Sequence, residues 1–213
     1  MQVGTGVQSG GILPKVGQEP VRRAALVSAT IREIGLAGSL DVTVGQIAKR
    51  AGMSTALAHY YFETKDAIFL AAMRHILTEF GVLVRSAIGS APTPAAKLNA
   101  IIDASLSREQ FADEVVAAWL VFYVQAQHST EAARLLRVYA RRLHSNLVAN
   151  LNTLVPRAQA VRIAQGVGAM IDGIYIRQAL HGGGPDRPSA RAMVKDYLHL
   201  SLVSDGVTLE TEH

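Results

Sequence analysis

The sequence predicts an all-α protein, and three observations support this prediction. Apolar residues recur at the three- and four-residue spacing of an amphipathic helix along most of the chain. No stretch of useful length alternates apolar and polar residues as a half-buried strand would. Residues that cap helices, such as Thr43, Ser54 and Thr64, precede several of the periodic stretches, and glycine or proline follows them.

The composition indicates a folded chain with a basic N-terminal region. Hydrophobic residues make up 49% of the sequence, which excludes extended disorder. Cysteine is absent, so disulfide bonds and thiolate metal sites are excluded, and a cytoplasmic location is expected. Residues 1–65 hold seven Lys or Arg against four Asp or Glu, whereas residues 66–213 hold fourteen against thirteen. This excess allows a polyanionic partner such as nucleic acid.

Neither a signal peptide nor a membrane span is expected. Residues 1–14 lack both a charged start and an apolar run. The longest apolar run, residues 115–124, has half of the roughly 20 residues that a membrane-spanning helix needs. It predicts a core helix.

The N-terminal third predicts three short helices after a flexible arm over residues 1–19. The first helix is expected from Pro20, with Gly35 and Gly38 ending it. Thr43 and Gln46 have the spacing of a capping box for a second helix that ends before Gly52. Ser54 then caps a third helix that reaches residue 62. Two short helices joined by a three-residue turn with glycine are typical of a helix-turn-helix unit.

Longer helices are expected in the rest of the chain. One starts after Thr64 and ends near Ile88, where Gly89, Pro92 and Pro94 interrupt the pattern. Others are expected over residues 94–108, 111–127, 130–154, 157–181 and 188–203. The predicted organisation is an arm at 1–19, a helix-turn-helix domain at 20–66, a helical domain at 67–203 and a flexible tail at 204–213.

A helix-turn-helix places its second helix in the major groove and holds phosphates with flanking groups. Small residues at the start of the third helix allow close approach, and Thr55, His59 and Tyr60 are expected to face the groove. Leu57, Ala58, Tyr61 and Phe62 can pack inward. The candidate DNA-contacting residues are Arg22, Arg23, Thr43, Ser54, Thr55, Ala56, His59, Tyr60, Thr64 and Lys65. An alternative is that the three neighbouring aromatic residues only fill a corner of the core.

The run TVGQIAKRAGMSTALAHYYFETKDAIFLAAM, residues 43–73, resembles the DNA-binding signature of the TetR family of transcriptional repressors. Ala56 and His59 stand where that family often has glycine and tyrosine. Further segments, among them VRRAALV at 21–27, AWLVFY at 118–123 and MIDGIYIRQAL at 170–180, are similar to the choline-responsive BetI branch. Together they extend the resemblance over about residues 14–203.

The resemblance implies a homodimeric, ligand-responsive repressor of a pseudo-palindromic double-stranded DNA operator, with choline or glycine-betaine metabolism as the expected pathway. It also implies dimerisation through the last two helices. The candidate interface residues are Gly166, Ala169, Met170, Gly173, Ile174, Met193, Val194, Tyr197 and Leu198. The alternative is that these glycines only ease packing within one chain.

A small-molecule effector would need a pocket in the helical domain. Trp119, Phe122 and Tyr123 share one helical face, and Asp172 and Tyr175 are candidates to join them. Aromatic faces hold quaternary ammonium groups such as choline through cation–π attraction. Aromatic residues at helical spacing are also common in cores, and Asp172 could instead cap a helix, pair with Arg177 or lie at the dimer interface.

No other function class is favoured. The glycines at 166 and 168 lack the strand and the third glycine of a dinucleotide site, and HGGGPDRP at 181–188 is typical of a loop between helices and not of a phosphate site. No metal-ligand spacing or nucleophile context is present, so no metal, cofactor or enzyme activity is expected. The competing hypotheses are a helical protein-interaction module without DNA binding and a TetR-like regulator of an unrelated pathway.

Overall fold

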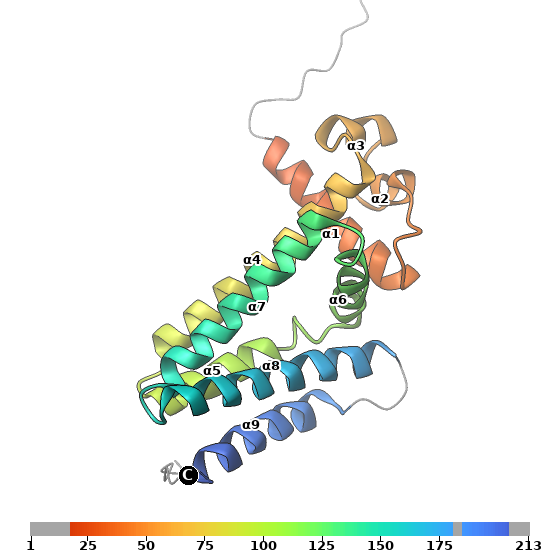
Figure 1. Cartoon of the computed structure of the whole chain (residues 1–213). Coiled ribbons are helices and arrows are strands. Elements are labelled where there is room, and N and C mark those ends of the chain that lie inside the picture. Colours follow the sequence, from red (N-terminus) through yellow and green to blue (C-terminus); the bar gives the residue numbers. More distant parts are fainter. Residues whose placement is uncertain (1–17, 181–184, 205–213) are drawn as a thin grey trace, which may run out of the picture.

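The computed structural model describes residues 18–180 and 185–204, and these residues form helices without strands. Most of the predicted arm and tail, and residues 181–184 of the loop predicted at 181–188, lie outside the described residues, and the helix after this loop already begins at Arg187. The helices, shown in Figure 1, are α1 (Glu19–Ala37), α2 (Val44–Arg50), α3 (Thr55–Tyr61), α4 (Lys65–Ser90), α5 (Pro94–Ser105), α6 (Asp113–Gln125), α7 (Thr130–Leu151), α8 (Arg157–Ala179) and α9 (Arg187–Val203). We call α1–α3 the head and α4–α9 the body.

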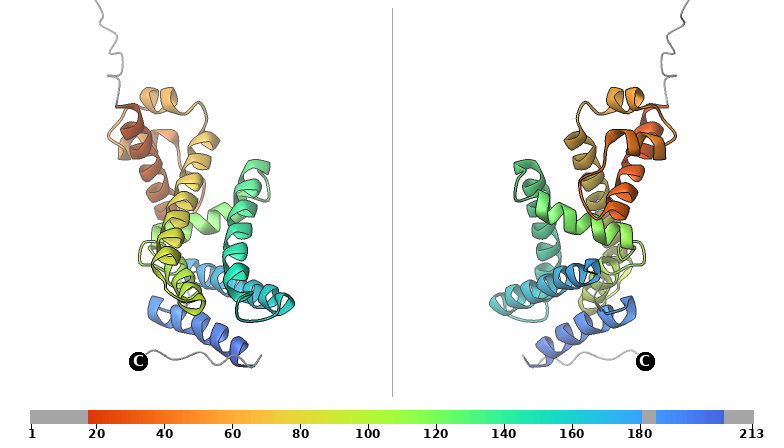
Figure 2. Two further views of the ribbon diagram at one scale, coloured as in Figure 1. Left: turned by 90° about the vertical axis from the view of Figure 1, so that its left-hand side faces the viewer. Right: turned by 90° about the vertical axis from the view of Figure 1, so that its right-hand side faces the viewer.

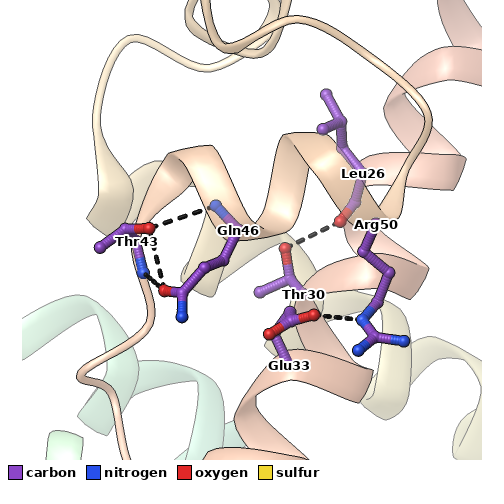
Figure 3. Close-up of polar contacts among 6 residues, drawn as sticks. All are labelled: Leu26, Thr30, Glu33, Thr43, Gln46 and Arg50. Carbon is purple, nitrogen blue, oxygen red and sulfur yellow. Dashed lines mark hydrogen bonds and ion pairs between the residues drawn. The ribbon is translucent and has the colours of Figure 1, made fainter.

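Local capping explains where the helices of the head begin. The Thr43 hydroxyl accepts a hydrogen bond from the backbone N–H of Gln46 at 3.2 Å, and the Gln46 side-chain oxygen accepts one from the Thr43 backbone N–H at 2.7 Å (Figure 3). This reciprocal pair confirms the predicted capping box. Ser54 likewise accepts from the Leu57 N–H at 3.2 Å and so starts α3.

Two glycines set the turns of the head. Gly38 ends α1 with φ of 61°, and Gly52 lies in the turn between α2 and α3 with φ of 68°. Both angles fall in the left-handed region that glycine adopts without a steric cost. The predicted stop at Gly35 is wrong, because α1 continues through it to Ala37.

Gly35 instead marks a close approach between head and body. A Cβ atom at this position would lie 2.5 Å from the Glu114 Cα at the start of α6, a distance that real side chains do not reach. Only glycine therefore allows α1 to pack this tightly on α6, and α1 and α6 make the most extensive contact between head and body.

The helices of the body surround a packed interior. In Figure 2, α4 and α7 stand on two sides, α6 crosses between them, and α8 and α9 lie across the end remote from the head. Large side chains without exposed surface, such as Leu98, Ile101 and Leu147, fill its interior. An ion pair of 2.8 Å between Lys195 and Asp103 joins α9 to α5.

Helix α4 also links the two parts. It extends to Ser90, past the predicted end near Ile88. By length and composition α4 could cross a membrane, although core helices of soluble proteins meet the same test. Its buried residues, including Ile68, Ala72 and Ile76, pack against α1, α5 and α7. These neighbours give α4 the surroundings of a core helix.

Candidate DNA-binding surface and effector site

The three neighbouring aromatic residues of α3 divide between surface and core. Tyr60 is 66% exposed, whereas Tyr61 and Phe62 are 4% and 5% exposed. Thr55, Ala56 and His59 are exposed as well, so the outer side of α3 carries small and polar groups together with one tyrosine ring. The prediction that Tyr60 is exposed and that Tyr61 and Phe62 pack inward is thus confirmed. α3 has a free face of the kind that enters a major groove.

Arg23 has a different role from the one its charge suggests. Its guanidinium donates a hydrogen bond to the Tyr61 carbonyl oxygen at 2.7 Å and lies 4.4 Å from the centre of the Phe62 ring. These contacts hold the end of α3 against α1. Arg22 donates to the Gln18 side chain at 2.9 Å on the exposed side of the same helix.

The remaining predicted contacts lie around α3. Thr64 caps α4 by accepting from the Ala67 N–H at 3.1 Å, and Lys65 is the first residue of that helix. The Lys65 ammonium lies 5.3 Å from the Phe69 ring centre, and Lys65 as a whole residue is half-buried. Arg50 of α2, not among the predicted residues, forms an ion pair with Glu33 of α1 that fastens α2 to α1 (Figure 3).

Inside the body, aromatic rings from three helices surround Trp119 of α6. The ring centre of Trp119 lies 4.8 Å from that of Tyr139, 6.0 Å from that of Tyr123 and 6.2 Å from that of Tyr175. Trp119 is 1% exposed, and its indole N–H has no acceptor within the described part of the chain. We call Trp119, Tyr123, Tyr139, Tyr175 and Asp172 the aromatic cluster.

Four of the five predicted effector-site residues come together in this cluster, and Phe122 does not. Phe122 lines a separate small cavity of about 20 Å³ with Asp66 and Phe69, on the side of α6 that faces α4. Tyr139, which was not among the predicted effector-site residues, completes the cluster through its contact with Trp119. Its signal was the apolar stripe of α7, in which Leu135, Tyr139 and Leu143 recur every four residues.

One carboxylate faces the rings. The Tyr123 hydroxyl donates to Asp172 Oδ1 at 2.8 Å. Burial raises the pKa of the Asp172 carboxyl, and the hydrogen bond from Tyr123 opposes that shift. Burial, with the Asp172 charge in second place, also raises the pKa of Tyr123. Tyr175 donates to the Ser105 carbonyl oxygen, which fixes its ring. The cluster thus combines aromatic faces with one negative charge.

In the described part of the chain, two grooves lie beside Tyr139 of the aromatic cluster. One, the α7–α8 groove, has a volume of about 270 Å³ and is lined by Tyr139, Ala140, Leu143, His144, Ala164, Gln165, Gly168, Ala169 and Asp172. The other, the α4–α7 groove, has a volume of about 470 Å³ and is lined by Arg74, Leu77, Thr78, Phe80, Gly81, Val84, Arg85, Leu135, Val138, Tyr139, Arg142, Leu143 and Asn146. Tyr139 contributes to both.

The candidate interface residues on α8 and α9 differ in exposure. Ala169 and Met193 are exposed, and Met170, Gly173 and Tyr197 are half-buried. Ile174, Val194 and Leu198 are at most 4% exposed and belong to the core of a single chain. A Cβ at position 166 would overlap the Tyr197 hydroxyl, so Gly166 is needed for packing within the chain.

Potential metal sites are not evident in the part of the chain that the structure describes, where no three His, Cys, Asp or Glu side chains gather to hold an ion.

Comparisons with known proteins agree with this fold. Residues 26–72 match the model of bacterial regulatory proteins of the tetR family, and residues 94–203 match the model of the C-terminal part of BetI-type transcriptional repressors. The HTH-type transcriptional regulator BetI of Brucella anthropi is 55% identical over 91% of this chain and 100% of its own length. Its counterpart in Agrobacterium fabrum is 48% identical over 90% of this chain and 93% of its own.

Solved structures share the architecture at lower identity. A TetR transcription regulator from Haloarcula marismortui has a TM-score of 0.75 at 24% identity, with 85% of this chain and 98% of that one covered. A protein from Saccharomonospora viridis, solved in complex with choline, has a TM-score of 0.75 at 22% identity, with 84% and 96% covered. At these identities the likeness shows the fold alone.

A helix-turn-helix head on a helical body defines a DNA-binding regulator, and the two family matches fall on these two parts. The chain belongs to the TetR family, and its C-terminal region is of the BetI type. It is a transcriptional regulator and not an enzyme.

Proposed function

We propose that the protein is a ligand-responsive repressor that binds a pseudo-palindromic operator as a homodimer, with residues 20–66 as the DNA-binding unit and 67–203 as the unit that binds effector and partner. The observation that carries the proposal is the free face of α3 on a head whose other aromatic side chains are buried. A cytoplasmic location goes with this function.

On DNA, α3 enters the major groove with its N-terminal end first. Thr55 and His59 reach base edges, and Tyr60 contacts the backbone or a thymine methyl group. Ser54 and Ala56 allow close approach, while Thr43, Thr64 and Lys65 lie at helix N-termini where backbone N–H groups attract phosphate. Arg22 adds a phosphate contact. Arg23 supports α3 through the Tyr61 carbonyl and therefore acts on DNA indirectly.

A gel-shift assay with the DNA that flanks the gene tests this proposal. We expect a shift that resists competitor DNA and weakens with salt. Substitution of Thr55 or His59 should change which bases are tolerated, by roughly 1 to 3 kcal/mol at the affected position. If no flanking segment shifts, the chain is better explained as a helical protein-interaction module that keeps the fold without binding DNA.

The effector we propose is a quaternary ammonium compound such as choline, held by the aromatic cluster. Ring faces attract such a cation by about 0.5 to 2 kcal/mol per contact, and Asp172 supplies the opposite charge. The indole N–H of Trp119, which has no acceptor among the described residues, would donate to a hydroxyl or carbonyl oxygen of the same ligand. The choline complex of the Saccharomonospora viridis protein is consistent with this class of ligand. An effector from an unrelated pathway is the alternative.

Binding at this place requires the rings to move. The Trp119 ring already contacts each of the three tyrosine rings, with centres 4.8 to 6.2 Å apart, so a cation between Trp119 and a tyrosine has to separate the two rings. Tyr139 and Asp172 line the α7–α8 groove, which offers the way in. Trp119 lies on α6, which packs on α1, so displacement of the rings can reach the head. An effector that prefers the opened cluster would thereby shift the head between two arrangements.

For the homodimer we propose the outer faces of α8 and α9. Exposed apolar side chains there form two stripes, Ala169, Ile176 and Leu180 on α8 and Met193, Leu200 and Val203 on α9. Gly173 lies in the α8 stripe, and no neighbouring atom of the described chain lies within 4 Å of the place that a Cβ of residue 173 would occupy. A second backbone can therefore approach it closely. Two copies joined here would present two heads to two half-sites.

A further inference from the structure

The α4–α7 groove differs from the aromatic cluster in its charge and its shape. Helices α4 and α7 both run from the head towards the far end of the body (Figures 1 and 2). The lining residues span 74–85 on α4 and 135–146 on α7, a rise of eleven residues on each helix. At about 1.5 Å per residue the groove is roughly 16 Å long. It is thus an elongated channel and not a round pocket.

Its charged side chains are all basic. Arg74, Arg85 and Arg142 line the groove, and no acidic residue of the described chain does. Within residues 18–180 and 185–204 none of these three guanidinium groups forms an ion pair with a carboxylate. The groove therefore carries positive charge that the described residues do not neutralise.

Arg85 points along the groove and not away from it. Its Nη1 atom lies 3.3 Å from the place that a Cβ of residue 81 would occupy. The guanidinium accordingly folds back over Gly81, itself a lining residue, because glycine leaves that space open. A long, charged side chain laid over an apolar channel is placed to meet a ligand there.

The polar and apolar groups are unevenly distributed along the groove. Because α4 and α7 run the same way, Arg85, Arg142 and Asn146 fall in the half remote from the head. Leu77, Phe80, Leu135 and Val138 line the half towards the head, where Arg74 marks the other end. Two guanidinium groups and one amide thus lie together at the end remote from the head, a single guanidinium lies at the other end, and an apolar wall joins the two ends.

We propose that the α4–α7 groove binds a carboxylate with an unbranched apolar chain, its carboxylate on Arg85 and Arg142 and its chain along Leu77 and Leu135. The planar guanidinium group matches carboxylate oxygens in pairs, and the apolar wall removes the chain from water. A quaternary ammonium compound is repelled here, so this is a second site of opposite charge. A polyanion such as nucleic acid would leave the apolar wall unused.

Isothermal titration of the full-length chain with octanoate tests the proposal. We expect saturable binding of octanoate, and no saturable binding of 1-octanol, which keeps the chain, or of acetate, which keeps the charge. Equal binding of octanol and octanoate would show a merely apolar groove and overturn the proposal, as would no binding of octanoate.

Arginine variants locate the site. Arg85→Gln and Arg142→Gln should each weaken octanoate binding about tenfold, the loss of one charge-assisted hydrogen bond. Arg141→Gln is the matched control, because Arg141 is exposed on the same helix and does not line the groove. The affinity of Arg141→Gln for octanoate should stay within twofold of that of the unmodified chain. If Arg141→Gln loses as much affinity as the groove variants, the loss comes from general surface charge and the assignment to the groove is wrong.

An occluding variant gives an independent check. Gly81→Leu places an apolar side chain in the groove, in a helix that tolerates leucine well, and should abolish octanoate binding. Circular dichroism and thermal unfolding establish that each variant is folded before titration. Full octanoate binding by folded Gly81→Leu would overturn the assignment to this groove. Since neither DNA nor a cationic effector enters these titrations, their outcome is independent of the proposed repressor function.

Discussion

At the scale of single residues, charge alone did not reveal which cations are free to meet DNA. Arg22 and Arg23 are neighbours in the sequence and were predicted to act alike. Arg23 binds the Tyr61 carbonyl and the Phe62 ring, whereas Arg22 contacts the exposed Gln18 side chain. The difference depends on which side of α1 faces α3, and this contact joins residues 38 positions apart.

Lys65 provides a test of phosphate binding. Lys65→Ala should weaken operator binding for all sequences and flatten the slope of log affinity against log salt concentration by about one, because one phosphate contact is lost. Quantitative gel shifts at several salt concentrations measure both effects.

Lys97→Ala is the control, since Lys97 lies in α5 of the body. If both variants change the slope equally, Lys65 makes no direct phosphate contact.

Asp172 provides a test of the cationic effector. Asp172→Asn keeps an acceptor for the Tyr123 hydroxyl but removes the charge, so choline binding should weaken by about 1.5 to 3 kcal/mol. At neutral pH the unfolding free energy should stay the same or rise, because a buried charge no longer has to be accommodated. Titration calorimetry and urea unfolding measure the two quantities.

The same residue predicts how pH affects the effector. Burial raises the pKa of Asp172 above its ordinary value of about 3.9. As pH falls through this raised pKa the carboxylate is protonated, so choline affinity should decrease at a higher pH than that at which ordinary aspartates titrate. Protonation also removes the destabilising effect of a buried charge on the folded state. Affinity that is independent of pH in the unmodified chain would remove Asp172 from the site.

At the scale of helices, most boundaries could be predicted because they depend on neighbouring residues. Thr43, Ser54 and Thr64 cap their helices through hydrogen bonds that span three positions. Gly35 could not be placed in this way. Its role depends on Glu114 of α6, far away in the sequence, and glycine by itself predicts a stop as readily as a close contact.

Gly35→Ala tests the contact between α1 and α6. The added methyl group would meet the Glu114 backbone at 2.5 Å, so the helices have to move apart, and we expect a loss of about 1 to 3 kcal/mol in unfolding free energy. Because the contact joins head to body, the choline concentration at which operator binding changes should also differ from that of the unmodified chain.

Gly89→Ala serves as the comparison. Gly89 lies near the end of α4 with no neighbouring atom of the described chain within 4 Å of an added Cβ, so alanine should leave stability unchanged or raise it by up to about 1 kcal/mol. Chemical unfolding compares the two variants directly. Equal stability in both would mean that the α1–α6 contact adapts without cost.

At the scale of the whole molecule, the aromatic cluster was only partly predictable. Trp119 and Tyr123 share a helical face that the sequence reveals, but Tyr139 reaches them from α7 and Phe122 turns towards α4. A periodic pattern indicates which side of a helix is apolar, but it does not indicate which other helix packs against that side. The packing of three helices decided which rings share one space.

The assembly can be tested on its exposed surface. Leu200, 66% exposed on α9, is proposed to lie between two copies, so Leu200→Glu should convert the dimer to a monomer and reduce operator affinity at least tenfold. Light scattering coupled to size exclusion measures the mass.

Val82→Glu, at 47% exposure on α4, introduces the same charge on another face and should leave the mass unchanged. A dimer that persists in Leu200→Glu would place the interface elsewhere.

Trp119 is the sole tryptophan of the chain, and it is buried among three tyrosines. Its emission therefore comes from one place, which makes the protein its own optical reporter. Any compound that parts these rings, or admits water to the indole, should alter the colour or intensity of that emission without a dye or label. Collections of small cations can thus be screened on the unmodified protein, and the response will arise from the cluster itself.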